Sequence, residues 1–176
     1  MSKTDGNLKA AFAGESQANR RYLAFAKAAD QEGQPQVAKL FRAAAEAETI
    51  HALAHLRAMG GVGQTLQNLE AAVAGETHEH TSMYPQFITE AEQEKADKAL
   101  VMFRFANQVE EIHAGLFSQL RATVAAGGKP TPTKIFVCSG CGNTVEGQAP
   151  DQCSVCGGPK KLFREIQKGA CLHAPQ

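Results

Sequence analysis

Two stretches of the sequence repeat a carboxylate followed three residues later by an imidazole. "ETIH" places Glu48 before His51, and "EEIH" places Glu110 before His113. On a helix, a spacing of three puts both side chains on the same face. Carboxylate oxygen and imidazole nitrogen are ligands of first-row transition metals, so the repeated pair points to metal chemistry.

Two further glutamates share this geometry if the surrounding helices form antiparallel hairpins. Residues of such a hairpin lie at one height when they are equally far from its turn. Glu15 and Glu48 are equally far from the break in "EGQP", and Glu76 and Glu110 are equally far from a break that we predict at 93–96. Each predicted hairpin therefore brings two glutamates to one level.

A fifth carboxylate, Glu79, lies one turn beyond Glu76 on the same helix face. The faces around the glutamates are rich in alanine and include Phe12, Tyr22 and Phe117. Five carboxylates that converge among apolar residues cannot all stay ionised unless cations compensate them. A glutamate from each of two helices plus Glu-x-x-His from each of two others is the di-iron ligand pattern of ferritin-like bundles. The sequence therefore predicts a site for two irons.

Four cysteines near the end of the chain form two Cys-x-x-Cys pairs. They are Cys138, Cys141, Cys153 and Cys156. Four sulfur ligands select zinc or iron in a tetrahedral site, and the spacing alone does not distinguish the two metals. Gly142 and Gly157 follow the pairs, which suits tight turns whose backbone N–H groups point at sulfur. Two disulfides are the disfavoured alternative, and Cys171 is left over as a spare thiol.

The elements that must position these ligands follow from periodicity. Apolar residues recurring at three and four predict helices at about 5–32, 36–58, 66–92 and 96–126. Pro85 falls inside the third helix, where a proline can kink it. We predict a mainly α protein with a ferritin-like four-helix bundle at 1–128, a linker at 129–134 and a small β-rich four-cysteine metal domain with a C-terminal tail at 135–176. A segment as short as the last one needs a metal staple.

Composition bounds the function classes. The chain has 176 residues, and its 18 Lys and Arg balance its 18 Asp and Glu. A formal charge of zero gives no support to nucleic acid or an anionic membrane as a partner. No apolar run approaches a membrane span, and the first residues lack the apolar segment of a signal peptide. The sequence predicts a cytoplasmic protein.

The residues assembled so far resemble the rubrerythrin family over essentially the whole chain. The matching stretches include "NLKAAFAGESQANRRYLAFAKAA", "AEAETIHALAHL", "FRFANQVEEIHAGLF" and "FVCSGCGNTVEGQAPDQCSVCGGPKKLF". The resemblance implies a ferritin-like di-iron bundle followed by a rubredoxin-like iron–tetrathiolate domain. It implies a cytoplasmic peroxidase that reduces hydrogen peroxide to water in oxidative-stress defence. Electrons would come from NAD(P)H through a separate reductase or rubredoxin and pass through the tetrathiolate iron to the di-iron site.

The resemblance also implies roles for the residues. The carboxylate ligands would be Glu15, Glu48, Glu76 and Glu110. Glu48 and Glu110 would bridge the irons, and His113 would bind one of them. Glu79 and His51 would be alternative ligands of the other iron, exchanged as the redox state changes.

The tyrosines and the assembly follow from the same resemblance. Tyr22 and Tyr84, the two tyrosines of the chain, would lie beside the di-iron site, with core packing as the alternative for both. The linker looks too short to let the cysteine module reach the middle of its own bundle. The resemblance accordingly implies a head-to-tail homodimer or higher homo-oligomer, in which each module serves the partner's irons.

Two other functions compete with peroxide reduction. A ferroxidase or iron-handling protein would use the same bundle, but the four-cysteine module argues against it because iron storage needs no dedicated electron carrier. A structural or binding role would place zinc in both sites. Visible absorption separates this last hypothesis from the others, because iron thiolates are coloured and zinc thiolates are not.

Overall fold

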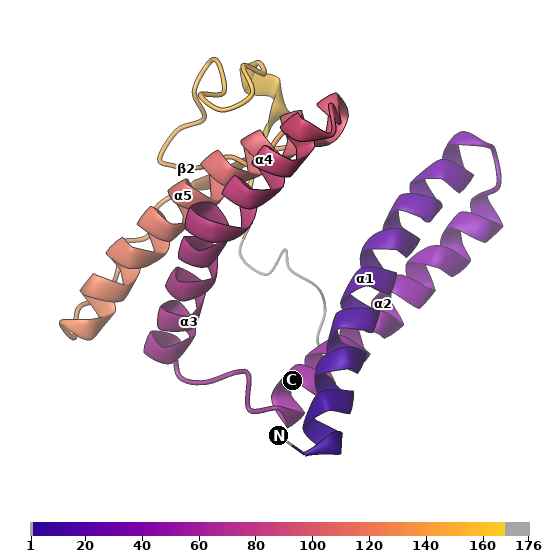
Figure 1. Ribbon diagram of the computed structural model, residues 1–176, viewed down its shortest axis with the longest axis horizontal. Helices are drawn as coiled ribbons and strands as arrows, with labels where there is room; N and C mark the ends of the chain where they lie inside the picture. Colours follow the sequence, from indigo (N-terminus) through magenta and orange to yellow (C-terminus); the bar gives the residue numbers. More distant parts are fainter. Residues whose placement is uncertain (1, 168–176) are drawn as a thin grey trace. The chain divides into compact units, whose positions relative to one another are not determined.

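The computed structural model describes residues 2–167, so Cys171 and the predicted tail lie outside the described residues. The chain divides into two compact units after Gly63. The first unit is an antiparallel pair of helices, α1 (Lys3–Gln31) and α2 (Pro35–Ala58) (Figure 1). The second unit begins with α3 (Thr65–His78), a π-helical turn (Glu79–Met83), α4 (Tyr84–Gln93) and α5 (Asp97–Ala125). The four predicted helices are confirmed, with ends that agree within two residues.

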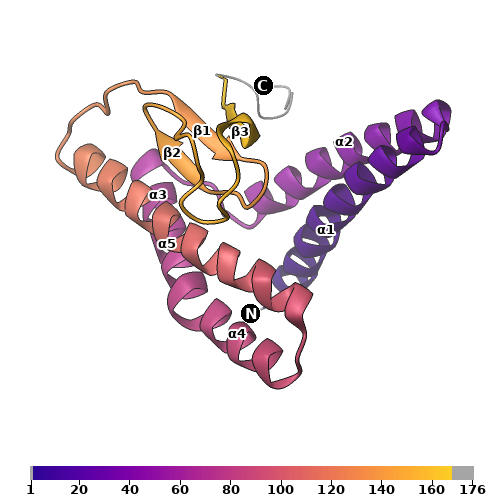
Figure 2. The same cartoon turned by 90° about the horizontal axis from the view of Figure 1, so that it is seen from above.

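A small β module follows α5 in the second unit. Its strands are β1 (Ile135–Cys138), β2 (Thr144–Glu146) and β3 (Phe163–Glu165), with a 3₁₀ turn at Lys160–Leu162. They form an antiparallel sheet in the order β2-β1-β3, shown over α5 in Figure 2. In its register Val137 faces Thr144 on one side and Arg164 on the other. The sheet thus holds both strands that flank the first Cys-x-x-Cys pair.

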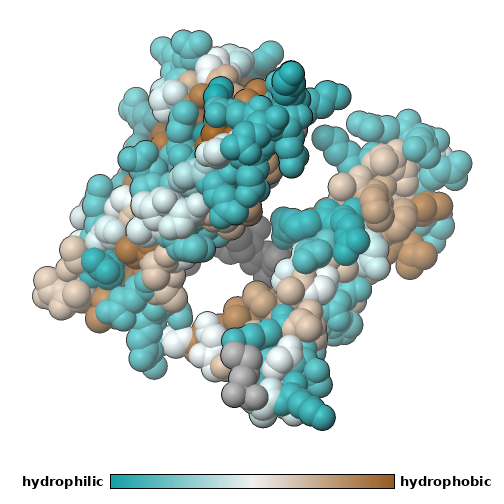
Figure 3. Space-filling view, viewed as in Figure 1, coloured by the Kyte–Doolittle hydropathy of each residue, from teal (hydrophilic) through white to brown (hydrophobic). Residues whose placement is uncertain are grey.

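The helices of the first unit approach closely because their contact is built from alanine. Ala26, Ala38 and Ala45 are buried there, whereas Phe25 and Leu40 remain exposed. Figure 3 shows such apolar residues on the surface of this hairpin. A two-helix hairpin with exposed apolar residues of this size presents a surface suited to packing against other helices. Separately, no helix within residues 2–167 combines the length and apolar character needed to cross a membrane.

The two helical hairpins repeat one another with a shift of 62 positions. The pairs Glu48 and His51 in α2 become Glu110 and His113 in α5. Matching positions also make matching contacts, which are the ion pairs Arg42–Asp30 and Arg104–Glu92 and the ring clusters Tyr22–Phe25–Phe41 and Tyr84–Phe87–Phe103. The repeat explains why each hairpin carries its own set of candidate ligands.

The π-helical turn is the place where the repeat is broken. Glu15 and Tyr22 are seven residues apart in α1, but Glu76 and Tyr84 are eight residues apart in the second hairpin. The backbone N–H of Tyr84 donates to the carbonyl of Glu79, the i to i+5 bond of a π-helix. One extra residue is therefore absorbed without losing the helix face. The helix continues through Pro85, which sits at the start of α4 where its missing N–H is tolerated.

The predicted turn at 93–96 contains no glycine, and Lys95 takes the left-handed conformation that a glycine usually adopts in such a turn. Lys95 has a φ of 56°, and its counterpart Gly33 has a φ of 72°. Both lie in the left-handed region, which costs a residue with a Cβ atom about 1 kcal/mol. Neither position is crowded, because Lys95 is exposed and a Cβ atom added at Gly33 would meet nothing within 4 Å.

These turns give opposite predictions for two matched substitutions. Lys95→Gly should stabilise the protein by about 1 kcal/mol, since it removes the left-handed strain. Gly33→Ala should destabilise it by a similar amount for the same reason. Denaturant unfolding of both variants beside the wild type measures the difference. A stabilising Gly33→Ala, or a destabilising Lys95→Gly, would contradict the assignment of strain to these turns.

Candidate metal centres

The first hairpin brings together Glu15 from α1 with Glu48 and His51 from α2. Their ligand atoms all lie within 4.8 Å of one another, and His51 Nδ1 is 3.1 Å from Glu48 Oε2. A hydrogen bond with Glu48 raises the pKa of Glu15, and desolvation and the charge of Glu48 add to the rise. The same bond with Glu15, followed by the bond with His51, lowers the pKa of Glu48. Glu15 and Glu48 therefore lie close enough for one cation to bind both carboxylates and offset their repulsion.

The second hairpin forms the matching group from Glu76, Glu110 and His113. His113 Nδ1 lies 2.9 Å from Glu110 Oε2 and 3.6 Å from Glu76 Oε2. Burial, then the hydrogen bond and charge of Glu110, raise the pKa of Glu76. Glu76 Oε2 is buried and accepts no hydrogen bond from the described residues. A buried carboxylate oxygen without a donor is costly, and a bound cation would satisfy it, so these residues fit a metal ion.

The other predicted site residues, which are Glu79, Tyr22 and Tyr84, lie outside the two three-residue ligand groups. Glu79 starts the π-helical turn and is not part of the three-residue group beside it. Burial and then the charges of Glu110, Glu79 and Glu76 raise the pKa of Tyr84, which places its hydroxyl in the field of all three carboxylates. Tyr22 lies in the ring cluster of the first hairpin. A role for Glu79 and the tyrosines in the site therefore remains a prediction.

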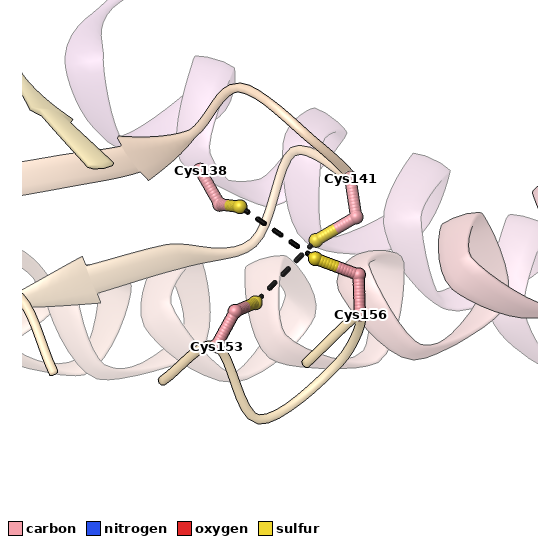
Figure 4. A group of neighbouring side chains, drawn as sticks. All are labelled: Cys138, Cys141, Cys153 and Cys156. Carbon is pink, nitrogen blue, oxygen red and sulfur yellow. Dashed lines mark hydrogen bonds between the residues drawn. The ribbon is translucent and has the colours of Figure 1, made fainter. Parts of the chain in front are cut away.

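The four cysteines converge as their spacing predicted, with their sulfur atoms turned toward one another in Figure 4. The Sγ atoms of Cys138 and Cys156 are 3.8 Å apart, and those of Cys141 and Cys153 are 3.6 Å apart. A disulfide needs about 2.05 Å. A tetrahedron with metal–sulfur bonds of about 2.3 Å has edges of about 3.8 Å, so the cluster fits a zinc or iron ion.

Two similar backbone turns carry the cysteine pairs. The N–H of Gly142 donates to the carbonyl of Cys138, and the N–H of Gly157 donates to the carbonyl of Cys153. Both glycines have left-handed φ angles, of 88° and 71°. These turns aim backbone N–H groups at sulfur, as the sequence predicted, with Asn143 donating to Cys141 in one of them.

Asn143 is a residue of the cysteine site that the sequence patterns did not single out. Its side chain is buried, and its Nδ2 lies 3.4 Å from Cys153 Sγ and 3.3 Å from Ser154 Oγ. Burial raises the pKa of the Cys153 thiol, but hydrogen bonds from the Cys156 backbone, the Asn143 side chain and the Val155 backbone outweigh it and lower the pKa to about 6. Burial raises the pKa of the Cys141 thiol to about 12. Cys153 is thus the sulfur best prepared to bind a cation as thiolate.

The cysteine module contacts its own α5 in the second unit. Thr144 Oγ1 lies 2.9 Å from His113 Nε2, and a Cβ atom at Gly142 would be 3.8 Å from Val109 Cγ1. The expectation that the linker is too short for such a contact is wrong. Residues 126–134 can span about 30 Å, whereas the helix from His113 to its end is about 18 Å long. The linker therefore has ample length to fold back along α5.

A cavity of about 290 Å³ opens between α5 and the module in the second unit. Its walls are Glu76, His113, Leu116, Phe117, Leu120, Ile135, Thr144 and Glu146. Two candidate ligands thus line a mostly apolar space of small-molecule size.

These features define a class of helical proteins with carboxylate–histidine metal ligands and an attached four-cysteine module. The sequence model of the rubrerythrin family, described as rubrerythrin, matches residues 6–121. The chain belongs to the rubrerythrin family, whose members are di-iron proteins with a rubredoxin-like domain.

Individual relatives agree with this assignment. Rubrerythrin of Porphyromonas gingivalis is 35% identical over 182 residues, covering 94% of this chain and 91% of that protein. Nigerythrin of Nitratidesulfovibrio vulgaris is 36% identical over 171 residues, covering 89% and 83%. The structure of nigerythrin in a partially reduced state matches with a TM-score of 0.56 and 33% identity, covering 94% of this chain and 88% of that chain. The predicted fold class is thereby confirmed.

The side chain of Asn143 gives a prediction for the cysteine site. Asn143→Leu keeps the volume but removes the N–H donor to Cys153. We expect the pKa of the Cys153 thiol to rise above about 6 in the metal-free protein. With iron bound, the reduction potential should fall by about 40 mV, the equivalent of one hydrogen bond of about 1 kcal/mol, because donors favour the more negative reduced state.

Thiolate absorbance against pH and redox titration measure the two effects. Ser154→Ala is the matched control, since it removes the other acceptor of Asn143 and leaves the bond to sulfur. An unchanged potential in Asn143→Leu would show that this bond does not tune the site.

Proposed function

We propose that this protein is a non-haem di-iron peroxidase of oxidative-stress defence that reduces hydrogen peroxide to water. Electrons would pass from NAD(P)H through rubredoxin or a separate reductase to a tetrathiolate iron, and from there to irons held by the helices. The hydrogen bond between the cysteine module and His113 carries the proposal. A protein that only stores or oxidises iron has no use for an electron carrier against its metal ligands.

The two carboxylate–histidine groups would together hold the iron pair. The proposed ligands are Glu15, Glu48, His51, Glu76, Glu79, Glu110 and His113. Bound as a ferrous pair, the irons would supply the two electrons that convert one peroxide molecule and two protons into two water molecules. Iron is supported by nigerythrin, which has been solved in a fully reduced, all-ferrous state. Zinc can substitute at either site, since its preferred ligands overlap with those of iron.

The two histidines are suited to different tasks in this scheme. His51 has a side chain that is 55% exposed, and Glu48 holds it through Nδ1. His113 is 27% exposed and is held at both ring nitrogens. The looser side chain is the better candidate for a ligand that leaves, which favours exchange between His51 and Glu79 and a permanent role for His113.

The surroundings of the ligands support a small oxidant as substrate. The cavity that Glu76 and His113 line has room for hydrogen peroxide and its products. Tyr84 has its pKa raised, by burial first, so its hydroxyl keeps its proton and can donate a hydrogen bond toward the carboxylates. We further propose a cytoplasmic homodimer or higher homo-oligomer, because packing between copies would cover exposed apolar residues such as Leu40.

The central test separates peroxide reduction from iron handling. Anaerobically reduced protein should be oxidised by one equivalent of peroxide much faster than by oxygen. Cys153→Ser should lose the red thiolate absorption and turnover coupled to a reductase, yet its helix site should still be oxidised once by peroxide. Rapid-mixing absorption spectroscopy follows both reactions. Preference for oxygen would favour the ferroxidase alternative, and undiminished coupled turnover in Cys153→Ser would remove the relay.

The extra carboxylate of the second hairpin gives a further prediction. Ferric ions gain more from an added carboxylate than ferrous ions do, so Glu79→Ala should still bind two irons while raising their potential. Its oxidation by peroxide should slow by about tenfold, the lower end for lost metal-site interactions. His51→Ala should instead weaken iron retention chiefly in the reduced state.

Iron content and stopped-flow oxidation of each variant provide the measurements. Glu90→Ala on the exposed surface of α4 is a matched control. If Glu79→Ala oxidises like the control, the exchange of ligands is wrong.

A further inference from the structure

A pair of buried polar side chains interrupts the alanine contact between α1 and α2. Asn19 on α1 is 5% exposed, and Thr49 on α2 is 8% exposed. The Nδ2 atom of Asn19 donates to the carbonyl oxygen of Ala45 at 2.7 Å and to Oγ1 of Thr49 at 2.8 Å. These two hydrogen bonds, which we call the Asn19 bridge, join one buried side chain of α1 to a single turn of α2.

The partners of the Asn19 carboxamide fix its orientation. A backbone carbonyl can only accept, so the atom that faces Ala45 must belong to the N–H₂ group. Both hydrogens of that group are then used, and Oδ1 is left buried without a donor among the described residues. A buried polar group that is only partly satisfied adds little or nothing to stability. Fixing one alignment of two helices is the best-attested use of such groups.

The alanine contact around the bridge does not specify an alignment by itself. On α2 the buried alanines are spaced by seven residues, at Ala38, Ala45 and Ala52. On α1 the buried Ala26 follows Asn19 by the same interval. Small side chains of one kind, repeated at one interval, pack almost equally well when helices slide or roll against each other. A unique polar contact removes this freedom, because other alignments leave the buried carboxamide without its acceptors.

The bridge lies beside the proposed ligands of the first hairpin. Asn19 is one helical turn from Glu15, and Thr49 directly follows Glu48. The turn of the hairpin is much farther away, because α1 ends at Gln31, about 24 Å along the helix axis from Glu15. Metal sites hold their ligand distances within about 0.2 Å. A small slide or roll of α1 on α2 would therefore move the two carboxylates apart by more than one metal ion tolerates.

The second hairpin lacks this bridge, although its fold repeats the first. With the shift of 62 positions, Ala45 corresponds to Asn107 and Thr49 corresponds to Glu111. Glu111 is exposed, and the buried Oδ1 of Asn107 accepts no hydrogen bond from the described residues. The Asn19 bridge is thus a specific feature of the first hairpin and not a requirement for building the repeated helix pair.

We propose that Asn19 is a positioning residue, whose hydrogen bonds to α2 hold Glu15 level with Glu48 so that one metal ion can bind both carboxylates. Asn19 itself is not a ligand. The inference rests on the proposed function, because these glutamates hold iron there, and it adds a residue that the ligand pattern does not contain. Since the bridge acts on alignment, its loss should change metal affinity more than it changes folding.

Cobaltous ion tests this role without relying on turnover. The four-cysteine site of the full-length chain is first filled with zinc, and cobalt is then competed against a chelator. Asn19→Ala extends the alanine pattern and removes the bridge, so it should weaken cobalt binding at the helix ligands by at least about tenfold. The urea midpoint without metal at the helices should change little, since alanine favours a helix more than asparagine does.

Two further positions separate alignment from a general loosening of the helices. Thr49→Val removes one acceptor of Asn19 and should weaken cobalt binding by about fivefold, the equivalent of one hydrogen bond, whereas Thr49→Ser should bind nearly normally. Ala26→Gly changes a residue two turns beyond Asn19 in the same contact. It should lower the urea midpoint, because glycine weakens a helix, and leave the cobalt affinity unchanged.

The outcomes separate this inference from the proposed function. Normal cobalt affinity in Asn19→Ala, or an equal loss of affinity in Ala26→Gly, would overturn the positioning role. A wild type that binds no cobalt at its helices would overturn it as well, since there would be no ligands to position. A reduced wild-type protein that does not react with peroxide would instead refute the peroxidase, and the cobalt affinities would still decide the role of Asn19.

Discussion

The main physical constraint on this structure is the repulsion between carboxylates that cluster on helix faces without enough cations to neutralise them. In each hairpin a glutamate from one helix meets the glutamate of a Glu-x-x-His pair. The contact with Glu48 raises the pKa of Glu15, and burial followed by the contact with Glu110 raises the pKa of Glu76. The buried oxygen of Glu76, which accepts no hydrogen bond from the described residues, makes the same point in geometric terms. Protons can separate these charges, but metal ions do so with more bonds and more charge. Within each hairpin, the long helices and the turn between them bring the carboxylate oxygens to one height.

The repeat of 62 positions allows the two hairpins to be compared residue by residue. Equivalent residues build equivalent ion pairs, ring clusters and ligand pairs in each. The differences fall at the metal groups. The second hairpin has Glu79 at a π-helical turn, at the position where the first hairpin has Ala18. Its histidine, His113, contacts Thr144, whereas the side chain of His51 is about half exposed. Two similar ligand sets are thereby made unequal.

Much of this arrangement was readable from the sequence, and the failures have physical causes. Helix ends and ligand heights followed from periodicity and from the symmetry of antiparallel hairpins, and the four-cysteine cluster followed from its spacing. The π-helical turn was not foreseen, because one extra residue barely disturbs a 3.6-residue period. Lys95 was not expected in a left-handed turn, since propensity favours glycine there. The contact of Thr144 with His113 depends on tertiary folding across the linker, and the contact of Asn143 with Cys153 depends on folding within the module. No local sequence pattern encodes either contact.

The single extra residue in the π-helical turn also bears on how such a protein could arise. Two copies of one hairpin, joined end to end, would carry the same ligands twice and treat both metal ions alike. Inserting one codon between the positions of Glu76 and Tyr84 shifts the register of the copy by one and accounts for the difference in spacing. Unequal ligand sets are therefore within reach of one small hereditary change acting on a duplicated gene segment, with the rest of the helix left in phase.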